Sequence, residues 1–165
     1  SAQATAAYYG ALNRIVLAEL MRIAWRELRS EVEAPLVYDL SHNLTIAAGG
    51  GRWLTRKGAA PAEAGAPVLI PGSMGAPSYV AVGLGSERHL CTASHGAGRS
   101  KSRTAMRHMK DLGLDGVECI TLSKDRKIEE SPAAYKNIGE VVNVQVAEGV
   151  ISLVAKLRPL LTFKA

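Results

Sequence analysis

The chain has 165 residues, a length typical of one domain, and 47% of them are hydrophobic. Twenty basic residues against 15 acidic ones give a net charge of +5, which is compatible with a polyanionic partner but does not require one. We find no apolar run of the ~18 residues that a membrane-spanning helix needs, and no signal-peptide pattern. The two cysteines form no CxxC pattern, which argues against a disulfide framework and favours reduced thiols in a cytoplasmic protein.

The first predicted element is a long helix over residues 4–30, where apolar side chains recur at helical spacing. Pro35 ends that region, and the apolar run 36–40 predicts a short buried strand that leads to Ser41-His42-Asn43. The three glycines at 49–51 predict a turn, with a strand after it at 52–56.

The remainder of the chain alternates short apolar runs with glycine-rich loops. We predict strands at 68–70, 78–84, 89–94, 117–122 and 156–163. A basic helix is predicted at 100–112, and a second helix opens at Ser131-Pro132, with serine as its N-cap. Residues 142–154 are apolar at mixed spacing and fit a helix or a strand. The expected fold class is α/β (mixed α+β), with mixed sheets and flanking helices.

The segment Ser94-His95-Gly96-Ala97-Gly98-Arg99 carries the sharpest chemical signal. Its small residues let a ligand approach backbone N–H groups, and Arg99 with the N-terminus of a following helix can add positive charge around a phosphate. A histidine beside such a phosphate cradle can act as a nucleophile, a general base or a metal ligand. The alternative is a glycine turn with an incidental surface histidine.

Three further segments are weak when taken alone. The turn Pro71 to Gly75 follows an apolar strand, and most such turns are only turns. His42 stands at a strand end but shows no short ligand spacing to another histidine, and a metal site needs three or more protein ligands. Tyr135 lies in a stretch that reads as a binding loop or as a solvated helix start.

Taken together and in order, these segments resemble the C-terminal half of the RtcB family of RNA ligases. The resemblance covers nearly the whole chain, and the agreement of seven segments in order and spacing makes it specific. The matching pieces are Asn13-Arg14, His42-Asn43, Arg56 to Ala59, Ile70 to Gly75 with Ser78-Tyr79, Ser94 to Arg99 with Ser102-Arg103, Glu130 to Lys136, and Leu157 to Pro159 through Lys164.

The resemblance implies an enzyme that joins RNA ends bearing a 3′-phosphate or 2′,3′-cyclic phosphate to 5′-hydroxyl ends, in tRNA splicing or RNA repair. Its cofactors would be GTP and Mn²⁺, with His95 as the nucleophile that carries GMP. It implies that His42 is a manganese ligand and that Asn43 contacts the nucleotide. The other implied nucleotide contacts are Pro71, Gly72, Ser73, Met74 and Ser78 around guanosine, Gly96, Ala97 and Gly98 beside the GMP, and Tyr135 and Lys164 at the guanine.

Departures from the family pattern concern mainly the metal. The family's other manganese ligands, an aspartate with a nearby cysteine and two histidines, come from an N-terminal half, and neither Cys91 nor Cys119 takes the place of that cysteine. Smaller departures are Asn137 where aspartate is common, Ala60-Pro61 where an arginine often follows, and Ala165 where glycine usually follows the lysine. We therefore expect an incomplete domain over 1–165: the helix 4–30, followed by a nucleotide-binding core at 36–165.

Such a chain is expected to be inactive by itself. It would work with the missing N-terminal half or a complementing subunit, and exposed apolar surface would favour self-association. A proteolytic or engineered fragment, one half of a split enzyme and a truncated natural relative all fit the sequence. One alternative function is a truncated, non-catalytic guanine-nucleotide- and RNA-binding module, which would bind without covalent labelling. Another is an interaction domain that docks through its long N-terminal helix.

Overall fold

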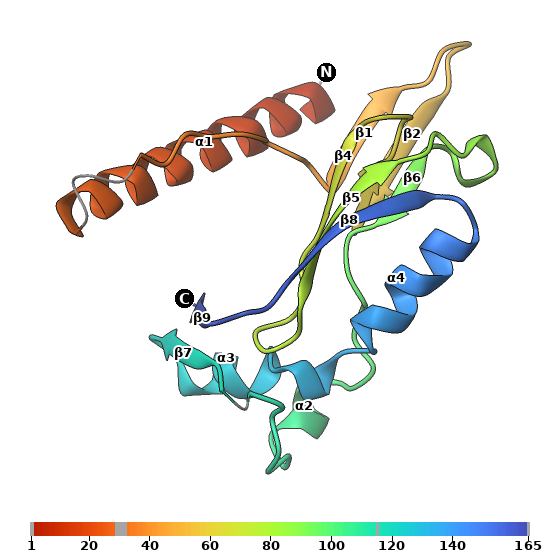
Figure 1. The fold of residues 1–165 in the computed structure, drawn as a ribbon. Coiled ribbons are helices and arrows are strands. Elements are labelled where there is room, and N and C mark those ends of the chain that lie inside the picture. Colours follow the sequence, from red (N-terminus) through yellow and green to blue (C-terminus); the bar gives the residue numbers. More distant parts are fainter. Residues whose placement is uncertain (1, 29–32, 115, 165) are drawn as a thin grey trace. The chain divides into compact units, whose positions relative to one another are not determined.

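A computed structural model describes residues 2–28, 33–114 and 116–164 and divides the chain into two compact units, Ser1–Lys57 and Gly58–Ala165. The first unit contains helix α1 (Ala2–Leu28) and the strands β1 (Asn43–Ala47) and β2 (Trp53–Lys57) (Figure 1). The second contains the remaining strands and helices. The expectation that 1–165 forms part of one ligase domain stays a prediction.

Helix α1 confirms the predicted N-terminal helix, although residues 29 and 30 of that prediction lie outside the described residues. Its sequence is rich in alanine, leucine, arginine and glutamate, which all favour helix. Many of its large apolar side chains are exposed, Tyr8 and Leu28 most of all. Crossing a membrane needs a long and strongly apolar helix, and none of the described helices, α1 included, meets both conditions.

The glycine turn and the strand after it are also confirmed. Gly49, Gly50 and Gly51 have φ of 78°, 55° and 72°, a left-handed conformation that glycine adopts without steric cost, and they connect β1 to β2. The two strands pair antiparallel, and the hydroxyls of Thr45 and Thr55 lie 3.1 Å apart across the hairpin. The predicted buried strand at 36–40 is wrong. Those residues form no regular secondary structure, since no described strand pairs with them, and Val37 is 70% exposed.

The second unit is built on a three-stranded antiparallel sheet. β4 (Pro67–Ile70), β5 (Ser78–Gly83) and β8 (Ile151–Leu157) lie in the order β4-β5-β8 (Figure 1). β3 (Ala59–Pro61) pairs with β6 (Thr92–Ser94), and β7 (Glu118–Thr121) pairs in parallel with β9 (Leu161–Lys164). These sheets confirm the mixed α/β class and most of the predicted strands. The strand predicted at 89–94 is shorter, because Glu87–His89 forms the 3-10 turn η1.

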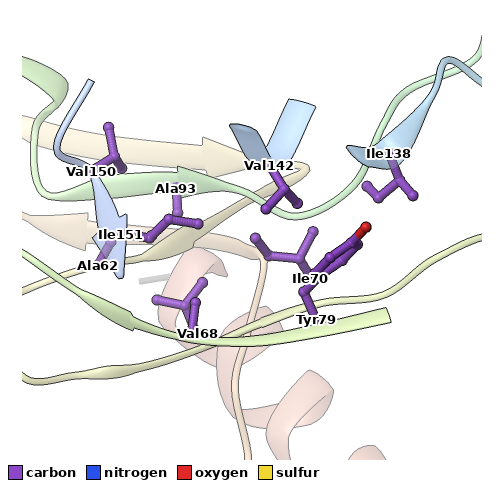
Figure 2. Close-up of a cluster of buried hydrophobic side chains, with 10 residues drawn as sticks. Ala62, Val68, Ile70, Tyr79, Ala93, Ile138, Val142, Val150 and Ile151 are labelled. Carbon is purple, nitrogen blue, oxygen red and sulfur yellow. The ribbon is translucent and has the colours of Figure 1, made fainter. Parts of the chain in front are cut away.

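Helix α4 (Ile138–Ala147) resolves the segment that fitted both a helix and a strand. The helix ends before Gly149, whose φ of 65° turns the chain into β8. Ile138 and Val142 lie one turn apart on the buried face of α4, and Figure 2 shows Val142 directed toward Ile70 and Tyr79. The core that they share is made of Ala62, Val68, Ile70, Tyr79, Ala81, Ala93, Ile138, Val142, Val150 and Ile151.

The predicted helix at 100–112 is largely wrong, since only the single turn α2 (Arg103–Met106) forms. Met106 is the one buried side chain of that turn, so the segment lacks the apolar stripe that supports a longer helix. A short helix that was not predicted, α3 (Lys124–Glu129), follows β7.

Two boundaries near the C-terminus also differ from the prediction. The element after Ser131 is the 3-10 turn η2 (Pro132–Ala134), and the serine hydroxyl donates to the Ile128 carbonyl at 2.9 Å instead of capping the turn. The strand predicted at 156–163 is divided at Arg158-Pro159 between β8 and β9, because proline cannot donate to a ladder.

Candidate functional site

A cavity of about 850 Å³ in the Gly58–Ala165 unit gathers most of the predicted nucleotide contacts. Its lining comes from the β4–β5 turn, the loop after β6, the segment before α4 and the last two strands. The predicted residues that line it are Pro71, Gly72, Ser73, Met74, Ser78, His95, Gly96, Ala97, Gly98 and Tyr135. Segments more than 60 residues apart in sequence thus share one concave site, the usual form of a small-molecule pocket.

Three predicted site residues are not part of this lining. His42 immediately precedes β1 in the Ser1–Lys57 unit, and Asn43 is the first residue of that strand, where it pairs with Lys57. Lys164 belongs to β9, where its backbone pairs with Thr121, and its side chain lies outside what the structure describes. Their proposed contacts with metal or nucleotide stay predictions.

The histidine is presented by a loop with a well-defined backbone. β6 ends at Ser94, whose hydroxyl donates to the Gly96 carbonyl at 2.7 Å, while the His95 amide donates to the Gly58 carbonyl at 3.1 Å. None of the described residues accepts a hydrogen bond from the amides of residues 96–98. Gly98 has φ of 69° and open space where a Cβ would stand. The loop can therefore offer several N–H donors to an anion beside the imidazole.

The opposite turn is held by its own hydrogen bonds. The Gly72 amide donates to the Ser78 hydroxyl at 3.0 Å, which joins the two ends of the turn between β4 and β5. A Cβ on Gly72 would stand 2.3 Å from the carbonyl oxygens of Ala76 and Pro77, so only glycine fits there. This close approach fixes the wall of the cavity formed by Pro71 to Met74.

Tyr135 is positioned by a charged network at the cavity wall, to which Glu130 also belongs. Its hydroxyl donates to the Glu130 carboxylate, and the Arg99 guanidinium lies 5.3 Å from the centre of its ring. Burial raises the pKa of Tyr135, and the hydrogen bond to Glu130 raises it further. The phenol therefore stays protonated at neutral pH and is held as a donor.

The interpretation of Arg99 as a residue that helps to hold a phosphate stays a prediction, and the structure shows that part of its guanidinium is engaged in internal contacts. Its guanidinium donates to the Glu129 carbonyl at 2.7 Å and lies 3.4 Å from a Glu130 carboxylate oxygen. The neighbouring basic residues are also engaged internally, since Lys101 donates to the Ala133 carbonyl at 2.8 Å and Arg103 pairs with Glu129 at 3.3 Å. This basic segment therefore braces the loop that carries Tyr135.

Several polar residues of the cavity lining were not among the predicted contacts, and Lys156 and Asn137 are two of them. Lys156 lies opposite Tyr79 on the paired strands β5 and β8, with its ammonium 6.0 Å from the centre of the tyrosine ring. Asn137 was noted only as a departure from the family pattern, yet its side chain accepts from the Gly139 amide at 2.9 Å and caps α4. Asn137 carried a recognisable N-cap signal, whereas finding Lys156 required the β5–β8 pairing.

The described residues fit a nucleotide better than they fit a metal ion. The cavity combines open glycine backbone with polar side chains and is large enough for a nucleotide. By contrast, the described part of the chain contains no group of three or more histidine, cysteine, aspartate or glutamate side chains that could hold a metal. His42 alone does not make a manganese site.

Comparison with known proteins by sequence identifies a family. Residues 1–165 match the family described as tRNA-splicing ligase RtcB. The RNA-splicing ligase RtcB of Mycobacterium tuberculosis is 36% identical over 97% of this chain and 43% of its own length. The tRNA-splicing ligase RtcB of Nanoarchaeum equitans is 33% identical over 99% of this chain and 41% of its own length. The RNA-splicing ligase RtcB of Escherichia coli is 44% identical over 56% of this chain and 24% of its own length.

The chain thus spans about two fifths of the length of the first two of these relatives. The match to the family covers every segment that lines the cavity, from the β4–β5 turn to β9. By sequence, and in agreement with the residues gathered around His95, the chain belongs to the RtcB family.

Proposed function

We propose that this chain forms the guanine-nucleotide-binding part of an RNA ligase that joins 3′-phosphate or 2′,3′-cyclic phosphate ends to 5′-hydroxyl ends through a His95–GMP intermediate. One observation carries the proposal: His95, the Pro71–Met74 wall and residues 96–98 converge on one cavity. No described residue accepts a hydrogen bond from the backbone N–H groups of residues 96–98. A nucleophile beside free N–H donors is the arrangement that phosphoryl transfer needs.

The proposed reaction has three displacements. An imidazole nitrogen of His95 attacks the α-phosphorus of GTP, so that a P–N bond forms as the P–O bond to pyrophosphate breaks. An oxygen of the RNA 3′-phosphate then takes the GMP from His95. Finally the RNA 5′-hydroxyl attacks the activated 3′-phosphorus, releases GMP and loses its proton as the phosphodiester forms. A cyclic phosphate would first be opened by water to a 3′-phosphate.

The chain's own groups would bind and orient the nucleotide in the first displacement. The amides of residues 96–98 would donate to the α-phosphate, where negative charge grows in the transition state. The Pro71–Met74 turn and Ser78 would enclose the guanosine, while Tyr135 and Lys164 would lie near the base and Asn43 would add a further contact. Because the Tyr135 hydroxyl donates its single proton to Glu130, its contact with the base would be through its ring or a lone pair of its oxygen.

We also propose that His42 contributes one ligand to a manganese site whose other ligands lie outside the described residues. When bound, manganese would neutralise phosphate charge and polarise the reacting groups. Because the described residues do not form such a site by themselves, this chain alone is expected to bind nucleotide weakly. The partners would be RNA, GTP and a polypeptide equivalent to the preceding part of the relatives.

Two lesser proposals follow from surface and thiol chemistry. Cys91 and Cys119 are free, which agrees with a reducing compartment and hence a cytoplasmic location. The apolar side chains exposed on α1 favour self-association of the isolated chain.

The second candidate function is a non-catalytic guanine-nucleotide- and RNA-binding module. The lack of a metal-ligand group among the described residues favours it, since the family's chemistry would then have no activating ion. This module would bind GMP in the same cavity and leave His95 unmodified.

Labelling with α-labelled GTP separates the two functions. The chain is co-expressed with the part of the Mycobacterium tuberculosis relative that precedes the matched region, and incubated with Mn²⁺. The ligase proposal expects an acid-labile adduct that His95→Ala abolishes and that the exposed control His108→Ala retains. An adduct that survives His95→Ala contradicts the assigned nucleophile, and reversible GMP binding without any adduct favours the binding module.

A further inference from the structure

Gln145 is a buried polar side chain that the proposed chemistry does not use. It lies on α4, two turns after Ile138 and on the same buried face as Ile138 and Val142, and it is 8% exposed. Its Oε1 accepts a hydrogen bond from the Ser94 amide at 2.7 Å, and its Nε2 donates to the Val141 carbonyl at 3.3 Å. The side chain does not line the cavity.

The hydrogen bond from the Ser94 amide to Gln145 matters because of the position of Ser94 in the chain. Ser94 is the last residue of β6 and the residue immediately before His95. The hydrogen bond therefore joins the backbone at the base of the proposed nucleophile to a helix 51 residues later in the chain. A partly buried amide that loses such a partner must stay unsatisfied, find another acceptor or become hydrated.

Two other hydrogen bonds restrain the same short loop. The Ser94 hydroxyl donates to the Gly96 carbonyl at 2.7 Å, and the His95 amide donates to the Gly58 carbonyl at 3.1 Å. The first of these bonds lies within the loop, and the second reaches Gly58, the residue before β3. The contact with Gln145 is the one of the three that anchors the loop to α4, which packs into the core through Ile138 and Val142.

We propose that Gln145 is a positioning residue for His95. By accepting from the Ser94 amide, it fixes the point at which the chain leaves β6 and thereby the direction from which the imidazole approaches a phosphate. A displacement at phosphorus needs the attacking atom in line with the leaving oxygen, so a small shift of this loop would lower the rate of attack with little effect on nucleotide binding. The inference rests on the function proposed for His95.

The test compares Gln145→Met, which keeps the length and helix preference of the side chain but removes its acceptor, with Gln145→Glu, which restores an acceptor. Val68→Ala is the matched control, since it weakens the same core from β4 and makes no hydrogen bond to the His95 loop. Two measurements are made on folded protein: amide hydrogen exchange at Ser94 in the chain itself, and the GTP dependence of His95 labelling in the co-expressed assembly.

We expect Gln145→Met to speed exchange at Ser94 and to lower the maximum labelling rate by about 10- to 100-fold, with the half-saturating GTP concentration nearly unchanged. Gln145→Glu should recover most of that rate, and Val68→Ala should leave it near the wild-type value. Unchanged Ser94 exchange in Gln145→Met, an unchanged maximum rate, or an equal loss in Val68→Ala would each overturn the positioning role.

Failure of the underlying function gives a different result. If the wild-type assembly forms no adduct, the proposed function falls, and the role of Gln145 in it falls too. If the wild type is labelled and Gln145→Met is labelled equally fast, only the positioning role falls.

Discussion

The two compact units differ sharply in how much side chain they bury. All the buried hydrophobic residues among those described, from Ala60 to Ile151, belong to the Gly58–Ala165 unit. In the Ser1–Lys57 unit, Arg56 is the one described residue in the buried class. The cavity around His95 thus stands on a packed core, whereas the long helix α1 depends on helix propensity and on polar contacts.

The two units are therefore suited to different roles. A reacting group needs a backbone that does not move, and a packed interior supplies it. An apolar helix face that stays exposed is suited to contact with another polypeptide surface instead. Four measurements test the contrast between the two units.

The largest effect is expected in amide hydrogen exchange of the isolated chain. Amides of α1 should exchange faster than those of α4 by on the order of 10³, because opening α1 exposes little that was buried. The check is residue-resolved exchange at neutral pH. Equal protection in the two helices would show that α1 is packed, contrary to the contrast drawn between the units.

The second-largest effect is expected in the free energy of unfolding, when a large apolar side chain is truncated in each unit. Ile70→Ala, at a fully buried position of β4, should lower the free energy of unfolding by about 2–5 kcal/mol. Leu17→Ala, on α1 where leucine is 51% exposed, should change it by no more than about 0.5 kcal/mol. Urea unfolding monitored by circular dichroism measures both. Similar losses would place Leu17 in a core.

The partly buried network of the second unit should show in a pH titration. The pKa of Tyr135 is raised in the folded protein, so its contribution to stability is complete below the pKa of an unfolded tyrosine and is lost as the pH rises through the higher folded value. Glu130→Gln should lower the pKa of Tyr135, because the carboxylate no longer opposes ionisation of the phenol.

The titration is followed by the ultraviolet absorbance of ionised tyrosine. Tyr135→Phe identifies the contribution of Tyr135 against the chain's other tyrosines. An unchanged titration in Glu130→Gln would mean that the hydrogen bond between the two side chains is not populated in solution.

The smallest effect concerns the ion pair of the first unit, in which Arg14 Nη2 lies 3.0 Å from Asp39 Oδ2. Both side chains are about a third exposed, so a double-mutant cycle of Arg14→Met and Asp39→Asn should give a coupling of at most about 1 kcal/mol. The hydrogen bond from Arg14 lowers the pKa of Asp39. The coupling is therefore present above the usual carboxyl pKa and is lost as the pH falls through the lowered value.

Salt provides the control for this pair. High ionic strength should weaken the coupling between Arg14 and Asp39, because exposed charges are screened. A coupling well above 1 kcal/mol that salt does not reduce would show that the pair is buried in solution.

Sequence reasoning predicted the elements whose signal is local. The helix α1, the glycine turn before β2 and the strands β4 and β5 follow from spacing and turn chemistry within a few residues. The segment 100–112 was mispredicted because its residues favour helix, but only Met106 of α2 finds a place in the interior. Local preference was thus outweighed by the lack of anything to pack against.

The site residues also divide into those with a local sequence signal and those that depend on tertiary packing. His95, the Pro71–Met74 turn and Tyr135 were singled out from local pattern and given roles by the family resemblance, and the structure brings them to one cavity. Gln145 was missed, although the sequence places this polar residue on the same helix face as the apolar Ile138 and Val142, which is unusual for a buried face. Its partner could not be read, because the bond from Ser94 depends on how β6 packs against α4.

The order of the lining along the chain has a consequence for biosynthesis. The cavity begins at Pro71, near the middle of the sequence, and is completed by Lys156 on β8 and by Phe163 on β9. On a ribosome, the loop with His95 would emerge long before the strands that finish its surroundings. A nascent chain would therefore carry the histidine without the complete cavity, so whatever the cavity does must wait until synthesis of this region is nearly complete.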